Sequence, residues 1–256
     1  MARRSKIKLI NKKERDMVAL KRCFVFAFLV LISFFPSQQL FAEEGFLNTS
    51  DGVKLFYEYF KASPQKGAVV LLHGSGMSYN EWADLREFLN QNGWSTIAID
   101  FRGHGASREQ GKRQLDFDSF SQDDILKMRN IDIPTATHFF KDTRPIWLIG
   151  SSFGAALGFS YATEKKGIRG VVLLSPTLDY PERRYQAEMT QYGNRPILVV
   201  ASEDDPKPFD SAAKLRKYAQ GKAKFIRYKA KGHGTRMLAA DKDLKNDILQ
   251  WLDQNS

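Results

Sequence analysis

The 256-residue sequence predicts an α/β fold in which helices cover both faces of a mostly parallel sheet. Short apolar runs alternate with helix-length segments from residue 53 onward. The inner runs are apolar at nearly every position, as strands buried on both faces require. An apolar fraction of 43%, with 12% aromatic residues, is enough for a sizeable core and excludes a disordered chain.

The elements are expected in a regular order along the chain. An amphipathic, β-rich segment at 53–60 is typical of an edge strand. Six further strands are predicted at 68–73, 95–101, 146–150, 171–174, 197–201 and 225–228. Helices are expected at 80–89, from Asp132 onward with Asp132 as the cap and Pro134 in the first turn, and at 152–164, 210–220 and 238–252. About 20 residues, 176–195, separate two late strands, which leaves room for one small helix or flap but not for a cap domain.

Residues 1–42 have the composition of a secretory signal peptide. They hold nine Lys and Arg residues, then the thirteen-residue run 23–35 in which Ser33 is the only polar residue, and they end on the small residue Ala42. A membrane-spanning helix needs about 20 apolar residues, so the length favours cleavage near Ala42 over an uncleaved anchor at 23–35. The sequence therefore predicts a signal peptide at 1–42, a folded domain at 43–256 and export to the periplasm or the medium. Membrane contact is expected only if the leader stays uncleaved.

The formal charge of +10 falls to +3 when residues 1–42 are left out. This removes most of the case for a nucleic-acid partner, which a strongly basic chain would otherwise suggest. The single cysteine, Cys23, excludes an intramolecular disulfide framework and a cysteine-rich zinc site. No oligomeric state is predicted.

The segment Ile146–Phe159 places Ser152 at the centre of a G-x-S-x-G motif, between a predicted strand and a predicted helix. A turn this tight leaves no room for side chains at its flanking positions, which Gly150 and Gly154 occupy. The turn exposes the serine at the positive end of the following helix. The motif in this context indicates a nucleophilic serine rather than a structural Gly/Ser turn.

A nucleophilic serine requires a base, and the base requires a group that orients it. Of the four histidines, only His233 follows Ser152, in a glycine-flanked loop before the last helix. The candidates for the orienting acid follow two strands. Glu203, Asp204 and Asp205 come after the buried strand at 197–201, and Asp179, a competing candidate, comes after an earlier strand.

The chain resembles the α/β-hydrolase superfamily over nearly all of 52–253, most closely its small esterase, lysophospholipase and serine aminopeptidase members. The order of serine, acid and histidine is that of this superfamily. The segments that carry the resemblance are DGVKLFY, VVLLHGSG, IAIDFRGHGAS, LIGSSFG, LVVASEDDP and GHG.

The resemblance implies a role for each of the matching residues. Ser152 corresponds to the nucleophile and His233 to the general base, while the backbone N–H groups of Ser75 and Phe153 correspond to the oxyanion hole. The acid is the fourth residue of a G-x-x-D loop, which falls on Asp205. Ser202 replaces the usual glycine of that loop, so Asp204 and Asp179 stay open as alternatives. His73 and the segment 100–105 are expected to brace loops around the site.

These observations predict a serine carboxylesterase that cleaves a small-molecule ester through an acyl-enzyme and uses no cofactor or metal. The serine argues against the branches of the superfamily that use aspartate or cysteine at this position. Esterase activity is favoured over peptidase activity, because no residue stands out as a clamp for a free amino terminus. The alternatives are a lysophospholipase or monoglyceride lipase that acts at the membrane, and a non-catalytic α/β-hydrolase binding protein.

Overall fold

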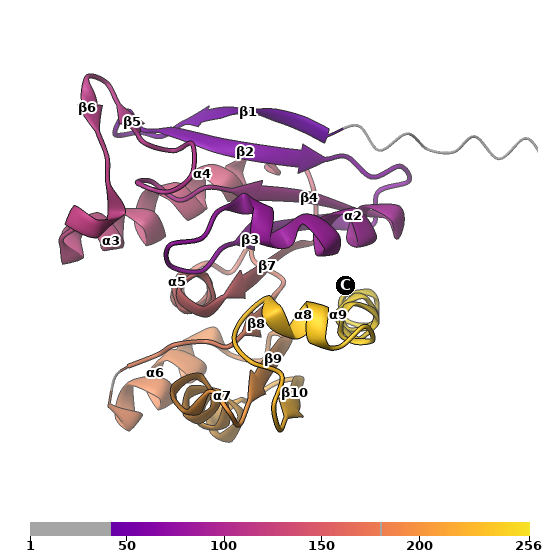
Figure 1. Cartoon of the computed structure of the whole chain (residues 1–256). Coiled ribbons are helices and arrows are strands. Elements are labelled where there is room, and N and C mark those ends of the chain that lie inside the picture. Colours follow the sequence, from indigo (N-terminus) through magenta and orange to yellow (C-terminus); the bar gives the residue numbers. More distant parts are fainter. Residues whose placement is uncertain (1–41, 180) are drawn as a thin grey trace, which may run out of the picture. The chain divides into compact units, whose positions relative to one another are not determined.

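A computed structural model describes residues 42–179 and 181–256. Eight strands form one sheet in the order β1-β2-β4-β3-β7-β8-β9-β10, with helices on both faces (Figure 1). All neighbouring pairs from β4 to β10 are parallel, and only β1–β2 and β2–β4 are antiparallel. The predicted fold class is therefore confirmed.

The predicted elements occur in the predicted order along the chain. The sheet consists of β1 (Ala42–Asn48), β2 (Lys54–Phe60), β3 (Gly67–Leu72), β4 (Trp94–Ile99), β7 (Ile146–Ser151), β8 (Gly170–Leu174), β9 (Ile197–Ser202) and β10 (Ala223–Tyr228), and β5 (Glu109–Gln110) and β6 (Arg113–Gln114) form a separate hairpin. The helices are α2 (Ala83–Gln91), α3 (Gln122–Lys127), α4 (Ile133–His138), α5 (Ser152–Glu164), α6 (Glu182–Tyr192), α7 (Pro206–Tyr218), α8 (Arg236–Ala240) and α9 (Leu244–Gln254).

Alternate residues of the central strands supply two separate cores. In β3, Val70 and Leu72 belong to the cluster that packs under α4, α5, α6 and α7, whereas Val69 and Leu71 belong to the cluster under α2, α8 and α9. This alternation is the period-2 geometry of a strand. It explains why the inner strands have no polar face.

The described part of the chain places β1, not β2, at the edge of the sheet, so the prediction that 53–60 is the edge strand was wrong. β1 pairs antiparallel with β2 from Ala42 opposite Phe60 to Asn48 opposite Lys54. Five of its seven residues are exposed, including Glu43 and Glu44. A mostly exposed strand has only a weak apolar alternation, which is why the sequence pattern did not indicate it.

The predicted signal peptide lies outside the described residues apart from Ala42, so it stays a prediction. Among the helices of residues 42–179 and 181–256, none combines the length and apolarity needed to cross a bilayer.

α4 begins at Ile133 with Asp132 at its N-cap position and Pro134 in its first turn, as predicted, but the helical segment that leads into it begins ten residues earlier, at Gln122. Ser121 caps α3 through the backbone N–H of Asp124, and a π-helical turn, Met128–Asp132, joins α3 to α4. Asp132 has helical backbone angles and makes no capping bond, because its side chain turns into the protein toward Arg102. The predicted helix at 238–252 is likewise divided, into α8 and α9.

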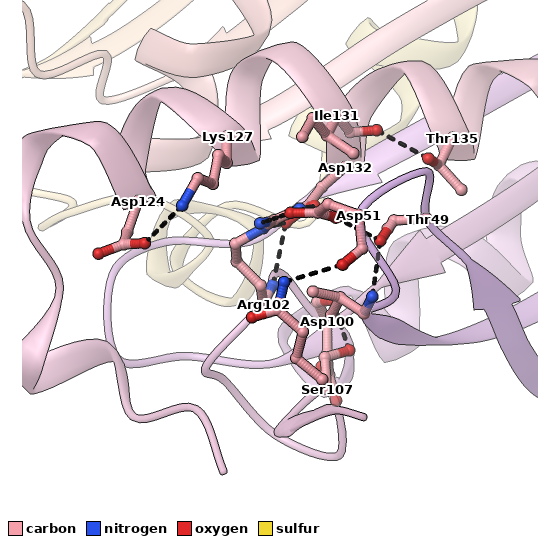
Figure 2. A network of polar contacts seen from close by, with 12 residues as sticks. Thr49, Asp51, Asp100, Arg102, Ser107, Asp124, Lys127, Ile131, Asp132 and Thr135 are labelled. Carbon is pink, nitrogen blue, oxygen red and sulfur yellow. Dashed lines mark hydrogen bonds and ion pairs between the residues drawn. The ribbon is translucent and has the colours of Figure 1, made fainter. Parts of the chain in front are cut away.

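Arg102 is the centre of a buried ion-pair cluster that connects three segments of the chain (Figure 2). Its guanidinium donates to Asp132 at 2.6 Å and to Asp51 at 2.7 Å, and its side chain is only 3% exposed. Burial alone would lower the pKa of Arg102, but the hydrogen bonds that it donates to Asp132 and Asp51 raise the pKa above its ordinary value. The cluster therefore fixes the loop after β4 to the β1–β2 turn and to the start of α4.

The turn between β7 and α5 is tight. Ser152 has a φ of +50°, in the left-handed region that residues with a Cβ avoid. A Cβ on Gly150 would lie 2.5 Å from the Cα of Ala155, and one on Gly154 would lie 2.3 Å from the carbonyl oxygen of Leu72. Only glycine fits at both positions, as the G-x-S-x-G motif predicted.

We expect Asp132→Ala to lower the free energy of unfolding by about 3–5 kcal/mol, because it leaves the buried Arg102 without one of its two carboxylates. Urea denaturation would measure this. The matched control is Lys127→Ala, which removes an exposed ion pair with Asp124 on the same helical segment (Figure 2) and is expected to change stability by about 0.5 kcal/mol or less. Equal effects of the two substitutions would contradict the structural role of the cluster.

Ser152→Gly is expected to stabilise the protein by about 0.5–1 kcal/mol, because glycine relieves the left-handed strain at a small entropic cost. Ser152→Ala keeps the Cβ and therefore the strain, so its unfolding midpoint is expected to stay at the wild-type value. If the two variants were equally stable, the turn would not be strained.

Candidate active site

A cleft of about 360 Å³ opens where the carboxyl ends of β3 and β7 meet the loop after β10. This is the sheet edge at which open α/β folds bind ligands. Its lining residues come from three loops and are Gly74, Ser75, Met77, Glu81, Ser151, Ser152, His233, Thr235 and Arg236. Three of the five predicted site residues, Ser75, Ser152 and His233, therefore line one cavity. A second cavity, of about 390 Å³, borders Ile146 at the start of β7 and contains none of the five.

Ser152 is the first residue of the 13-residue helix α5. The first backbone N–H groups of a helix have no intrahelical acceptor, and the N–H of Phe153 is one of them. The loop with Ser75 passes close by, since a Cβ on Gly74 would contact the Cβ of Ser152 at 3.6 Å. The two predicted oxyanion donors thus belong to segments that meet at the serine.

His233 and Asp205 are joined by a hydrogen bond of 2.5 Å between Nδ1 and Oδ2. A carboxylate only accepts, so Nδ1 carries the proton, and Nε2 is the nitrogen that a neutral imidazole would leave free to act as a base. The His233 side chain is 43% exposed and that of Asp205 is 22% exposed. This is the arrangement by which a carboxylate orients an imidazole base.

The two other candidate acids make different contacts. Asp204, adjacent to Asp205, accepts the backbone N–H of Gly232 at 3.2 Å and so supports the backbone of the histidine loop, not its imidazole. Asp179 is exposed in the loop after β8, and its charge acts on Tyr185. Among the hydrogen bonds of the described residues, Asp205 alone of these three acids reaches His233.

Ser202, which replaces the usual glycine of the acid loop, has a structural role at the end of β9. Its hydroxyl accepts the backbone N–H of Lys231 at 2.9 Å. A further hydrogen bond from Ser202 is the largest of the influences that lower the pKa of Asp204. The departure from the family pattern therefore adds contacts between the acid loop and the histidine loop.

His73 and Asp100 connect loops behind the cleft, as the sequence suggested. His73 Nε2 accepts the backbone N–H of Phe101 at 2.9 Å, and its Nδ1 donates to the carbonyl of Gly74 at 2.7 Å. Complete burial lowers the pKa of His73 to about 3, so it stays neutral. Asp100 accepts the backbone N–H groups of Tyr79 and Ala106. The resulting frame supports the loop that contains Ser75.

Glu81 is the cleft residue of most chemical interest that the sequence pattern missed. It lies in the 3₁₀ turn Tyr79–Trp82, and its Oε1 accepts the backbone N–H of Gly74 at 2.9 Å. Burial raises its pKa to about 7. No motif marks it, because a single glutamate before an amphipathic helix is an ordinary helix-start residue.

Within the described residues, no group of three or more His, Cys, Asp or Glu side chains is placed to hold a metal ion.

Several curated proteins have similar sequences over part of this chain. A monoglyceride lipase from Mus musculus is 31% identical over 132 residues, which cover 51% of this chain and 42% of that protein. A non-heme chloroperoxidase from Streptomyces lividans is 33% identical over 100 residues, 39% of this chain and 35% of that protein. The matched regions thus span less than half the length of these relatives.

The fold is shared with solved structures of low sequence identity. A Pyrococcus furiosus esterase has a TM-score of 0.65 at 19% identity, and the match covers 84% of this chain and 91% of that chain. The mouse alpha/beta hydrolase domain-containing protein 10 has a TM-score of 0.66 at 17% identity, with 84% and 100% covered. The sequence profile described as serine aminopeptidase, S33, matches residues 63–235, well over half of the chain, and the chain therefore belongs to this family of α/β-hydrolases.

Proposed function

We propose that the chain is a serine hydrolase that cleaves carboxylic esters through an acyl-enzyme intermediate. The observation that carries the proposal is the cleft in which Ser152, strained at the first position of α5, and the Asp205-bonded His233 both lie. The esterase and lipase relatives support the same reaction class.

In the first half of the proposed reaction, the Oγ of Ser152 attacks the ester carbonyl carbon while its proton passes to Nε2 of His233. Asp205 stabilises the resulting imidazolium. The tetrahedral oxyanion accepts hydrogen bonds from the N–H groups of Ser75 and Phe153, each worth about 3 kcal/mol. Collapse of the intermediate breaks the bond to the alcohol oxygen, and His233 returns the proton to the departing alcohol.

The second half repeats these steps with water as the nucleophile. His233 takes a proton from the water, the hydroxide oxygen adds to the acyl carbon, and the bond to Ser152 breaks as His233 protonates its oxygen. The products are the carboxylic acid and the free enzyme. No cofactor or metal enters these steps.

We favour an ester over a peptide substrate because the acidic side chain in the cleft is already hydrogen-bonded within the protein. A free amino terminus requires an acidic partner, and Glu81 is the acidic side chain among the cleft residues. Its carboxylate already accepts from the N–H of Gly74 and from the hydroxyls of Ser151 and Thr235, so its oxygens have partners within the protein. We further propose, from the leader sequence alone, that the enzyme acts after export.

The proposal predicts that a fluorophosphonate labels Ser152, since this reagent traps an activated serine. Ser152→Ala is expected to lose all labelling. His233→Ala and Asp205→Asn are expected to lower kcat/KM on a p-nitrophenyl ester by about 10³–10⁴-fold. Intact-mass spectrometry and initial rates measure these effects.

Asp204→Asn is the matched control, because it makes the same replacement of a carboxylate by an amide at the adjacent residue. It is expected to retain kcat/KM within a few-fold. A wild-type chain that does not label would refute the proposed nucleophile, and equal losses in the Asp204 and Asp205 variants would refute the assignment of the acid.

A monoacylglycerol is the second candidate substrate, because monoglyceride lipases from mouse and human are among the relatives. The described residues between β8 and β9 contain the single helix α6, and Met77 at the cleft is 48% exposed. Such an open site favours short, water-soluble acyl esters. We expect kcat/KM to be at least about tenfold higher for p-nitrophenyl butyrate than for a dispersed long-chain monoacylglycerol. The reverse order would favour the lipase.

A further inference from the structure

Glu81 makes contacts to all three loops that form the cleft. Its Oε1 accepts the backbone N–H of Gly74, next to the predicted oxyanion donor Ser75. Its Oε2 receives a long contact of 3.5 Å from the hydroxyl of Thr235, two residues after His233. Its carboxylate also accepts a hydrogen bond from Ser151, which precedes Ser152.

The groups around these contacts are closely packed and hydrogen-bonded to one another. Ser151 is buried, and a Cβ on Gly234 would lie only 2.5 Å from its Oγ, so the histidine loop packs directly against the nucleophile turn. The N–H of Gly234 donates to the hydroxyl of Ser175 at 2.9 Å. The N–H of Met77 donates to the carbonyl of Gly74, which closes the turn that begins the oxyanion loop.

The charges around Glu81 leave its carboxylate with neutral partners. Arg236 and His233 line the same cleft, and Asp100 lies behind it through its bond to the N–H of Tyr79. Among the ion pairs of the described residues, none includes Glu81; its hydrogen-bond partners are a backbone amide and two hydroxyl groups. The carboxylate of Glu81 is therefore held by hydrogen bonds to neutral groups and not by an ion pair.

We propose that Glu81 is a positioning residue for ester hydrolysis, whose ionised carboxylate holds the Ser75 loop, the Ser152 turn and the His233 loop in their catalytic arrangement. This inference rests on the proposed function. An ionised carboxylate accepts from all three donors, whereas its protonated form has one oxygen that must donate. Protonation therefore forces one of the contacts between the loops to reverse its direction or to break.

Glu81 changes its protonation state within the pH range over which enzyme activity can be measured. Because burial raises its pKa to about 7, the ionised fraction declines as the pH falls through 7. His233 must also be neutral to act as a base, so it contributes a loss of activity in the same direction. The wild-type acidic limb is expected to contain two ionisations.

The decisive variant is Glu81→Gln, which preserves shape but cannot ionise. We expect kcat/KM on p-nitrophenyl butyrate at pH 8 to fall about tenfold, with most of the loss in kcat and little in KM. The acidic limb of its pH profile is expected to contain one ionisation instead of two. The rate of fluorophosphonate labelling is expected to fall by a similar factor.

Two further variants separate positioning from folding. Glu87→Gln makes the same chemical change at an exposed position on α2 and is expected to keep the wild-type rate and pH profile. Glu81→Asp retains a carboxylate, so it is expected to keep two ionisations at a reduced rate. Thermal unfolding of each variant verifies that the fold is intact.

A Glu81→Gln enzyme with the wild-type rate and two ionisations would overturn the inference while leaving the proposed function in place. A wild-type chain that neither labels nor hydrolyses esters would overturn both. The two failures are therefore distinguishable in the same set of measurements.

Discussion

The close approach of the α5 backbone to the end of β3 is the constraint on which the rest of the site depends. Gly154 lies against the carbonyl oxygens of Leu72 and His73, where any side chain would collide. This contact places the start of a helix directly beside the loop that follows β3. The serine, the helix N–H groups and the Ser75 loop are thus brought together by backbone packing, before any side chain contributes.

Around this contact the protein uses polar side chains mainly to hold loops. His73 is kept neutral by burial, Asp100 accepts two backbone amides, and Arg102 joins three segments through paired carboxylates. Each of these groups is satisfied inside the protein, so their burial is compatible with stability. The site residues can then stand partly exposed on loops that buried polar contacts hold in place.

Much of the fold and site followed from local signals in the sequence. The inner strands are short apolar runs, the serine turn requires glycines on both sides, and His233 is the sole histidine beyond the serine. The edge strand β1, the helical segment before Asp132 and the contacts of Glu81 did not follow. Each of these is decided by partners distant in the chain: β2 for the strand, Arg102 for Asp132, and the Gly74, Ser151 and Thr235 groups for Glu81. The pattern of residues within one segment does not show which distant residues that segment will contact.

The open sheet of the described residues ends in two strands whose outer backbone groups lack a neighbour in the order, β1 and β10. Such edges can recruit strands from other molecules and start aggregation. β1 presents Glu43 and Glu44 at its exposed end, and β10 bears Lys224 and Arg227, each held in an ion pair. Charges placed on both margins make it costly for another strand to dock there. The exposed, charged residues that made β1 difficult to predict from the sequence therefore also disfavour edge-to-edge association.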